Sequence, residues 1–543
     1  MLKRATLKAV ALCALIAAAP APAPISAERI RADVRTLASD AFDGRGPGEK
    51  GEAATIEFIA RSFAKAGLEP GGEGGRWTQD VPLVRLDRQP GATLSVRIAG
   101  RTQQLRLGKD STLSLRNAGR YDLADAPLVF AGWGIVDPAR GWNAYEGVDM
   151  RGKVAVLLAN DPDMEAGRDL GFGGRALAFS GRSGTKVAAA AKAGAAGVLI
   201  IHEEAAFSWP FTQAGSGDVL PSIAFAPVQQ SSLGFSAIVR REVALVLLRQ
   251  LGLSLPGLKA RARNPGFRAF PLRGASASAD GSNRATPFIS RNVIGKLRGT
   301  DRPNDYLLYG AHWDANGHNG PDAHGDSIRN GAIDNATGTA ELIEVARAFA
   351  AAKRPRRSVL FAAWTSEEKG LLGAEYYAAH PLYPLARTAA VINLDPHVVL
   401  PASRTLELIG PGQTDLEGEL RRAAASGGQR VVAEPSPEAG WYYRSDHYPF
   451  AQRGVPALAF RAGRDLIKGG RAVGERTIAT YNRTCYHQPC DEYDPRWTFA
   501  GTAQEATAAF RVGQSIANRK DWPKWLAGSD FSVIRAASDA DRR

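Results

Sequence analysis

Six side chains of types that commonly bind metal ions occur in this sequence, and several of them follow short apolar segments. The candidates are His312, Asp334, Glu367, Glu368, Asp395 and His487. Two histidines with several carboxylates form a typical ligand set for catalytic zinc, in which one coordination position stays open for water. Two such ions, about 3.5 to 4 Å apart, clamp a nucleophile and polarise a carbonyl together. This set of residues therefore predicts a hydrolase.

Each candidate also has an ordinary structural explanation when it is taken alone. A histidine at the end of a strand, such as His312, is usually a polar surface residue. Asp334 stands in a loop of small residues before a helix, where an aspartate fits the N-cap position. The neighbours Glu367 and Glu368 would be unimportant on a solvated helix, but in a buried place they repel unless a cation or a proton neutralises one. The metal interpretation therefore depends on the whole set.

Short apolar strands alternate with helices in the part of the chain that carries these residues. Strands are predicted at 292–295, 306–311, 358–364 and 389–394, and helices at 338–351 and 370–379. This alternation predicts an α/β fold with a mixed, mostly parallel sheet that is flanked by helices. Ligands of such sheets bind outside the carboxyl ends of the strands. Because His312, Glu367 and Asp395 each follow a strand, we expect them at the same edge.

The segments before this sheet predict further units. Residues 30–68 have the apolar spacing of helices around a glycine-rich turn, Gly44-Arg45-Gly46-Pro47-Gly48. Short apolar runs and an alanine-rich helix then indicate a compact α/β insert, and the Ser, Ala and Gly residues of 274–284 indicate its exit linker. The expected units are a signal peptide at 1–27, an N-terminal part of the main domain at 28–120, the insert at 121–273, the main domain at 274–520 and a C-terminal tail at 521–543.

The N-terminus and the composition indicate where the protein acts. Lys3, Arg4 and Lys8 precede a short apolar run and a small-residue site that ends at Ala27, which is typical of a secretory signal. No later apolar run is long enough to cross a bilayer, so we expect periplasmic or extracellular export without stable membrane insertion. The formal net charge is +13, but the arginines are scattered, and no nucleic-acid partner is expected.

Six ordered motifs resemble a known family. They are His312-x-Asp314, Asp334-Asn335-Ala336-x-Gly338, Glu367-Glu368, Asn393-Leu394-Asp395, Ser445-Asp446-His447 and Cys485-Tyr486-His487-x-x-Cys490. This pattern is similar to the co-catalytic di-zinc aminopeptidase family, whose clan includes glutamate carboxypeptidase and the transferrin-receptor ectodomain. The insert resembles the protease-associated domain often found in these enzymes. The resemblance covers most of the mature chain.

The resemblance implies a role for each site residue and two Zn²⁺ ions per chain. Asp334 would bridge the two ions, His312 and Asp395 would complete one site, and Glu368 and His487 the other. Glu367 would be the general base that takes a proton from a metal-activated bridging water and returns it to the leaving amine. The implied activity is that of an exported aminopeptidase that acts on peptides.

Four further residues complete the predicted site. Asp314 is placed to accept the second ring proton of His312 and so to fix its tautomer. By resemblance, Tyr486 would donate a hydrogen bond to the developing oxyanion and Arg444 would hold a product carboxylate. Cys485 and Cys490, which by spacing alone fit either a disulfide or two metal-binding thiolates, would form a disulfide across the His487 loop.

The sequence departs from the family pattern at two positions, and three alternative functions stay open. Pro396 follows the metal-binding Asp395, and Ile333 stands where a second acid often precedes the bridging Asp334, so side-chain specificity is not transferred. The alternatives are a carboxypeptidase or dipeptidase of the same clan, a binding protein without metals, and a one-zinc glutaminyl cyclase. Loss of the metals would show as replaced ligands, and every ligand position is filled. The oligomeric state is left open.

Overall fold

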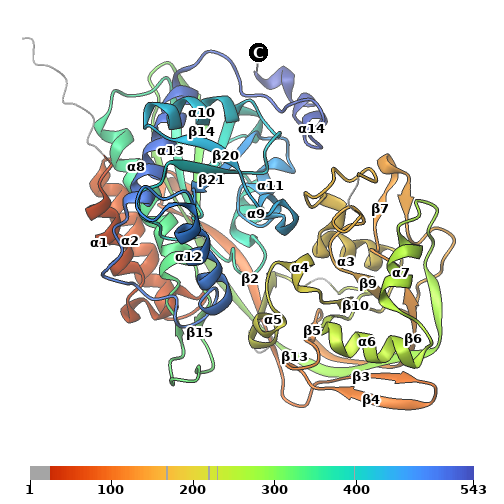
Figure 1. Cartoon of the computed structure of the whole chain (residues 1–543). Helices are drawn as coiled ribbons and strands as arrows, with labels where there is room; N and C mark the ends of the chain where they lie inside the picture. The colour runs from red at the N-terminus through yellow and green to blue at the C-terminus, as the bar shows by residue number, and fades with distance from the viewer. Residues whose placement is uncertain (1–24, 167–168, 218–220, 229, 397, 543) are drawn as a thin grey trace, which may run out of the picture.

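The computed structural model describes residues 25–166, 169–217, 221–228, 230–396 and 398–542, which form two lobes (Figure 1). Most of the expected signal peptide lies outside these residues. The two predicted N-terminal helices are present as α1 (Ala27–Leu37) and α2 (Gly51–Ala66). The Ser26 side chain caps α1 by accepting a hydrogen bond from the backbone N–H of Arg29, which satisfies one of the free donors at a helix start.

The first lobe is built on a mixed, mostly parallel sheet, as predicted. Its central strands are β17 (Arg357–Trp364), β14 (Arg302–His312), β18 (Thr388–Asn393) and β21 (Ala457–Ala462), which pair in parallel. Antiparallel pairs extend both sides, with β13 (Phe270–Leu297) beside β17 and with β19 (Thr405–Ile409) beside β21. A last strand, β20 (Arg430–Ala433), pairs in parallel with β19.

Helices cover both faces of this sheet. Leu307 and Phe361 contribute to a core with α1, α2, α8 (Gly338–Ala351), α10 (Leu416–Ser426) and α13 (Ala500–Asn518). Their neighbours Leu308 and Leu360 point to the other face and pack with α9 (Leu372–Ala379) and α11 (Tyr448–Ala451). Because successive side chains of a strand alternate between faces, these continuous apolar runs are what a sheet covered on both sides requires.

The second lobe has its own parallel strands and core. β9 (Val154–Leu158) and β10 (Gly197–Ile201) lie between β6 (Gly119–Phe130) and β12 (Phe235–Val239). The helices α3 (Ser183–Lys192), α6 (Arg241–Gln250) and α7 (Leu255–Ala262) add residues to this core. The core also includes Leu94 and Val96 of β3 (Thr93–Ile98), which come before the expected start of the insert at 121.

The expected exit linker at 274–284 is wrong, because these residues lie inside the 28-residue strand β13. Ala275, Ala277 and Ala279 face the second core at alternate positions, while β3 and β6 pair with this part of the strand. The middle of β13 pairs with β2 (Thr78–Arg88), and its end pairs with β17 of the first lobe. One continuous strand therefore joins the two lobes (Figure 1).

Residues 521–542 fold onto the first lobe instead of extending from it. Trp525 forms an isolated β-bridge with Thr414 and donates from its indole nitrogen to the carbonyl of Gly454 at 2.7 Å. The segment ends in the short helices α14 (Ser532–Ala536) and η9 (Asp539–Arg542). The stretch expected as a C-terminal tail is thus part of the packed structure as far as it is described.

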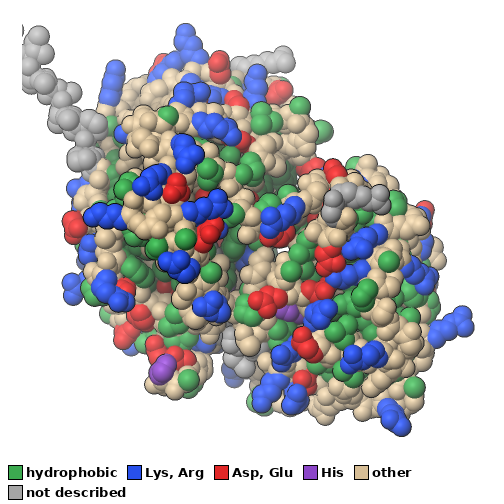
Figure 2. Space-filling view, in the orientation of Figure 1, with side chains coloured by type: hydrophobic (Ala, Val, Ile, Leu, Met, Phe, Trp, Pro, Cys, Tyr) green, Lys and Arg blue, Asp and Glu red, His purple; other side chains and the backbone are tan. Residues whose placement is uncertain are grey.

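Two surface properties bear on the expected location and partners. Among the described residues no single helix is long and apolar enough to cross a membrane. Helices α6 and α7 reach that length and apolar composition only together, and they are bent by 90° relative to each other. Lys and Arg side chains are spread over the face shown in Figure 2, with Asp and Glu between them. The same view shows a hollow between the two lobes.

Candidate metal centre

Parallel strands bring the predicted metal ligands to one edge of the sheet. His312 is the last residue of β14, Glu367 and Glu368 follow β17, and Asp395 follows β18. Asp334 comes from the turn before α8, where its peptide bond to Asn335 is cis. His487 follows α12 (Gly470–Thr484) and has a positive φ of 60°. The structure therefore brings together all six residues proposed as ligands or general base.

The two carboxylate oxygens of Asp334 face different histidines. Oδ1 lies 3.3 Å from Nε2 of His312, and Oδ2 lies 3.2 Å from Nε2 of His487. Asp395 approaches the first histidine at 3.8 Å, and Glu368 approaches the second at 3.1 Å. Two triads result, His312 with Asp334 and Asp395, and Asp334 with Glu368 and His487, and within each the ligand atoms lie within 4.8 Å of one another.

The chemistry of these triads fits metal ions. His312 is 1% exposed, and its Nε2 atom has no hydrogen-bond partner among the described residues. The same holds for Nε2 of His487 and Oε1 of Glu368. Buried polar atoms without partners are costly, and a cation in each triad would satisfy them and offset the repulsion among the carboxylates. The donor set, with histidine nitrogens and carboxylate oxygens and no thiolate, is one that suits zinc.

Glu367 lies beside the triads without belonging to either. Its Oε2 is 3.8 Å from Nε2 of His312, and it lines a cavity at the metal centre. Burial raises the pKa of Glu367 well above its usual range; His312 opposes this shift, while Asp446 and Asp395 add to it. A carboxylate whose proton affinity is raised and which borders the reaction cavity is suited to accept and return a proton.

Asp314 contacts His312 through its main chain and the two glutamates through its side chain. Nδ1 of His312 lies 3.0 Å from the backbone carbonyl of Asp314 and 3.7 Å from its carboxylate. The carboxylate instead accepts hydrogen bonds from the backbone N–H groups of Glu367 at 3.0 Å and Glu368 at 3.4 Å. Asp314 thus orients the histidine through its main chain and the two glutamates through its side chain.

A chain of hydrogen bonds orients Asp395. Ser445 donates to the Asp395 carboxylate at 2.5 Å and accepts a bond from the Asn393 amide at 2.7 Å. The neighbouring Asp446 is buried, and both of its carboxylate oxygens lack a hydrogen-bond partner among the described residues. Burial raises the pKa of Asp446 well above its usual range. The motif that begins at Ser445 therefore supports the centre without entering either triad.

The sequence analysis missed Arg45, which is fully buried beneath the site. Its guanidinium donates to the carbonyl of Trp313 at 2.8 Å, next to His312, and to the carbonyl of Gly331 at 2.8 Å, in the loop before Asp334. Further bonds reach the carbonyls of Leu37 and Asn330. One cation thus ties two ligand loops together, and the only signal in the sequence is its place in the glycine-rich turn.

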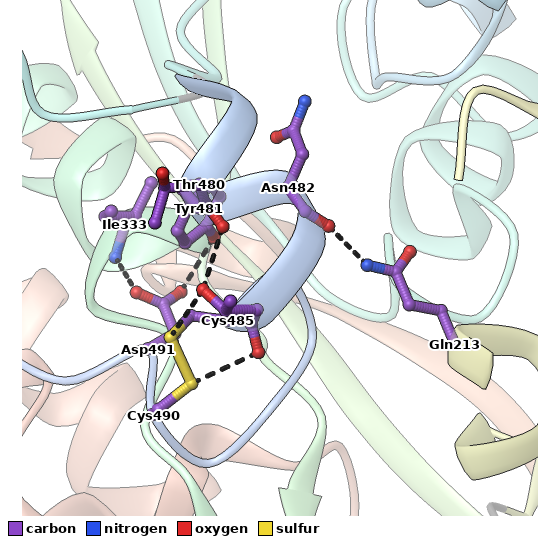
Figure 3. The surroundings of a disulfide bond; sticks show 9 residues. Gln213, Ile333, Thr480, Tyr481, Asn482, Cys485, Cys490 and Asp491 are labelled. Carbon is purple, nitrogen blue, oxygen red and sulfur yellow. Dashed lines mark hydrogen bonds between the residues drawn. A yellow bond between two sulfur atoms is a disulfide. The ribbon is translucent and has the colours of Figure 1, made fainter. Parts of the chain in front are cut away.

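Asp491 was missed as well. Its carboxylate accepts hydrogen bonds from the backbone N–H group of Ile333 at 2.9 Å and from the Tyr481 hydroxyl at 3.1 Å (Figure 3). It also accepts one from the backbone N–H group of Asp334 at 3.1 Å. Asp491 directly follows Cys490, which forms the disulfide with Cys485. The loop that carries His487 is thereby tied to the loop that carries Asp334. Such groups around metal ligands commonly affect metal affinity 10- to 100-fold.

We expect loss of the disulfide to weaken zinc binding more than folding. A bond across a sequence separation of 5 closes a short loop and adds little chain-entropy stabilisation. Cys485→Ser with Cys490→Ser should therefore lose zinc at a lower chelator concentration than wild type, while the melting temperature changes little. Metal content after graded chelation, followed by calorimetry, tests this. Equal zinc retention in both proteins would contradict it.

The cavity beside the triads has a volume of about 60 Å³, with carboxylates of the metal centre and two arginines in its walls. Tyr486 lines it, stacks on His487 with ring centroids 3.8 Å apart, and accepts a hydrogen bond from Arg444 at 3.4 Å. Arg444 and Arg461 also line it, and their guanidinium carbons lie 4.4 and 5.5 Å from the ring centre of Trp441. Both predicted substrate-binding residues, Arg444 and Tyr486, therefore border the metal centre.

Comparisons with known proteins agree with this geometry. Residues 292–511 match the model of peptidase family M28. The chain is 30% identical to aminopeptidase NAALADL1 of Mus musculus over 218 residues, which are 37% of this chain and 27% of that protein. It is 41% identical to a probable zinc metalloprotease of Pyrenophora teres f. teres over 109 residues, 20% of this chain and 23% of that protein. The matched parts thus span about a quarter of these relatives.

The fold comparison extends over both lobes. An aminopeptidase from Aneurinibacillus sp. strain AM-1 superimposes with a TM-score of 0.54 at 18% sequence identity, covering 92% of this chain and 95% of the other. At this identity the likeness concerns the fold alone. Together with the family match and the two triads, it confirms the resemblance that the six motifs indicate. Residues 292–511 of the chain therefore form a region that matches peptidase family M28.

Proposed function

We propose that the protein is an exported zinc aminopeptidase that removes N-terminal residues from peptides. The observation that carries this proposal is the placement of Asp334, whose two oxygens face His312 and His487 in two adjoining triads. Two zinc ions per chain would be held there, with His312 and Asp395 on one and Glu368 and His487 on the other. The family match over residues 292–511 supports peptidase chemistry at this centre.

The residues around the triads have separate roles in the proposed hydrolysis. Zinc ions, when bound, lower the pKa of a coordinated water and polarise a carbonyl. Glu367 accepts the proton of the attacking water and delivers it to the leaving amine. Tyr486, on the cavity wall, donates a hydrogen bond to the oxygen on which negative charge develops. Carboxylates at the centre, Asp395 among them, attract the positively charged amino terminus of the substrate.

The decisive experiment measures metal content and two activities on the same preparation. We expect about two zinc ions per chain, release of the first residue from peptides and aminoacyl anilides, and no cleavage when the amino terminus is acetylated. Chelation should abolish activity and zinc should restore it. Cleavage of acetylated peptides from the carboxyl end would contradict the proposal.

The two arginines at the cavity favour a second candidate, a carboxypeptidase or dipeptidase of the same clan. Arg444 and Arg461 both border the cavity next to the triads. Paired arginines recognise carboxylates, and the guanidinium group is always charged. In an aminopeptidase the same groups would accept an acidic first residue or a product carboxylate. Peptides whose carboxyl terminus is free or amidated separate the two candidates, because only the carboxypeptidase requires the free acid.

The second lobe, which we propose to be the protease-associated domain, borders the approach to the metal centre. A cleft of about 460 Å³ is lined by Trp209 and Ile223 of this lobe and by Glu368 and His487 of the first lobe. The lobes are also joined by hydrogen bonds, such as that from Arg182 to the carbonyl of Tyr443 at 2.8 Å. Clefts between domains are common ligand sites, so the second lobe is placed to limit the size of peptides that reach the zinc ions.

We expect Trp209→Ala to widen this approach. The indole lines two clefts between the lobes. Its removal should therefore increase the cleavage rate of long peptides relative to that of an aminoacyl anilide, which is small enough to reach the centre in both wild type and variant. The ratio of the two kcat/KM values, at equal zinc content, is the measurement. An unchanged ratio would show that Trp209 is no gate.

A further inference from the structure

Five arginines surround one tryptophan at the edge of the sheet opposite the metal centre. The guanidinium carbons of Arg302, Arg357, Arg387, Arg535 and Arg542 lie 5.4, 5.0, 5.8, 5.8 and 6.0 Å from the ring centre of Trp522. Significant contacts between a cation and an aromatic ring occur about once in 70 to 80 residues, so five on one ring are a local concentration.

The strands fix the position of this cluster relative to the metal ligands. β14 begins with Arg302 and ends with His312, and β17 begins with Arg357 while Glu367 follows its end. Arg387 precedes β18, and Asp395 follows it. At about 3.3 Å per residue, the length of β14 separates the two places by roughly 30 Å. The cluster therefore belongs to a different site.

A pocket of about 630 Å³ opens at this cluster. Trp522, Arg302, Arg535 and Arg542 line it, together with Lys520 and Lys524. Trp522 is half-buried, and the C-terminal helices α14 and η9 form part of the wall. This volume lies within the range of about 300 to 1,000 Å³ that small-molecule sites occupy.

Many of the arginine N–H groups at the pocket donate hydrogen bonds to neutral groups, which leave the positive charge of the arginines in place. Arg357 donates to the backbone carbonyls of Ile516 and Arg519 at 2.6 and 2.7 Å, and Arg535 donates to that of Thr388 at 2.9 Å. Carbonyl groups accept these bonds without carrying a negative charge. The Nε atoms of both buried arginines have no hydrogen-bond partner among the described residues.

Carboxylates offset only part of this charge. Asp305 is fully buried and forms ion pairs with Arg302, at 2.7 Å, and with Arg387. Asp539 pairs with Arg542, and Asp521 also lines the pocket. Among the described residues, the five arginines around Trp522 and the two lysines that line the pocket thus outnumber these three carboxylates. Burial, with the like charge of Arg542, lowers the pKa of Arg535 to about 9, and Asp539 opposes this shift.

We propose that this pocket binds a small organic dianion, a phosphate monoester or a dicarboxylate, at a site separate from the metal centre. The guanidinium groups of Arg302, Arg535 and Arg542 bond to carbonyl, hydroxyl and carboxylate groups of the protein, so they attract a dianion mainly through their charge. The lysines that line the pocket add ammonium groups, which act as point charges. The Trp522 ring offers an apolar surface for the carbon body of the ligand. The proposal does not depend on the peptidase activity.

The test titrates the zinc-loaded full chain with glycerol 3-phosphate, succinate and neutral glycerol by isothermal titration calorimetry. We expect saturable binding of at least one dianion and none of glycerol, and the stronger of the two dianions identifies the ligand class. Lys524→Met and Arg542→Met should each weaken that binding by about tenfold, because a charge-assisted contact is lost. Lys524 is exposed, so its replacement leaves the packing intact.

Arg496→Met is the control for a general loss of positive charge, since it removes an arginine that is likewise paired with a nearby aspartate, Asp494, but that is exposed, whereas the Arg542 side chain is buried. Its affinity for the dianion should stay within about twofold of wild type, because general loss of positive charge has only a screened effect at physiological salt. Absence of saturable binding in wild type would overturn the proposal. Binding that Lys524→Met and Arg542→Met leave unchanged would also overturn it, since the dianion would then bind elsewhere, for example at zinc.

Discussion

Glu367→Gln is expected to lower kcat by about 10²- to 10⁴-fold while both zinc ions stay bound, because that is the usual contribution of a general acid and base. Glutamine keeps the size of the side chain and cannot accept the proton of the attacking water. Glu367 lies outside both triads, so its loss removes no ligand. The measurement is kcat on an aminoacyl anilide, with zinc counted on the same sample.

Glu368→Gln is the matched control for this prediction. The substitution is chemically identical and one residue away, but Glu368 lies 3.1 Å from His487 in the second triad. It should lose zinc together with activity, and added zinc should partly restore the rate. Added zinc should have no such effect on Glu367→Gln. If Glu367→Gln kept near-normal turnover, or lost zinc as Glu368→Gln does, the assignment of the base would be wrong.

The sheet and the ligand types could be predicted from sequence because they depend on local patterns. The run 306–311 is apolar throughout and is followed by His312, so both the strand and the place of the histidine at its end could be read from neighbouring residues. The same holds for Glu367 after β17 and Asp395 after β18. Parallel strands then bring residues at their carboxyl ends together, whatever their distance along the chain.

The supporting residues could not be predicted in this way, because their partners are distant in the sequence. Arg45 contacts the carbonyl of Trp313, and Asp491 contacts the backbone of Asp334, and neither pair shares a local pattern. Asp314 was expected to accept the second ring proton of His312, but the two-residue spacing does not say which of its oxygens is used. The backbone carbonyl makes that contact, at 3.0 Å.

Composition was misleading for strand β13. Serine, alanine and glycine between 274 and 284 are typical of a linker, yet these small residues fit between β3 and β6 and turn alternate side chains into the second core. Tertiary pairing thus overrides the weak preference of such residues against strands. The same strand continues into the first lobe, where its end pairs with β17, which carries Glu367 and Glu368 after its last residue.

Asp334→Asn should have the largest effect on metal binding, because Asp334 is the only residue shared by the two triads. Asparagine has the same shape but presents one neutral oxygen and one amide group, so it cannot offer an anionic oxygen to each ion. We expect zinc content to fall below one ion per chain after dialysis and activity to be lost at zinc concentrations that saturate wild type. Loss of a single ion with the other site intact would show that Asp334 serves one site only.

The variant Asp491→Asn distinguishes the loss of the Asp334 carboxylate from a change in the position of the loop that carries Asp334. Asp491 holds the backbone of Ile333 and Asp334 but faces neither histidine, so its loss alters the position of Asp334 while leaving its carboxylate in place. Zinc affinity should fall by about 10- to 100-fold, and excess zinc should restore the activity. Asp334→Asn should not recover under the same conditions. If the two variants behaved alike, Asp334 would act by shaping the loop, and the proposal of a shared bridging carboxylate would fail.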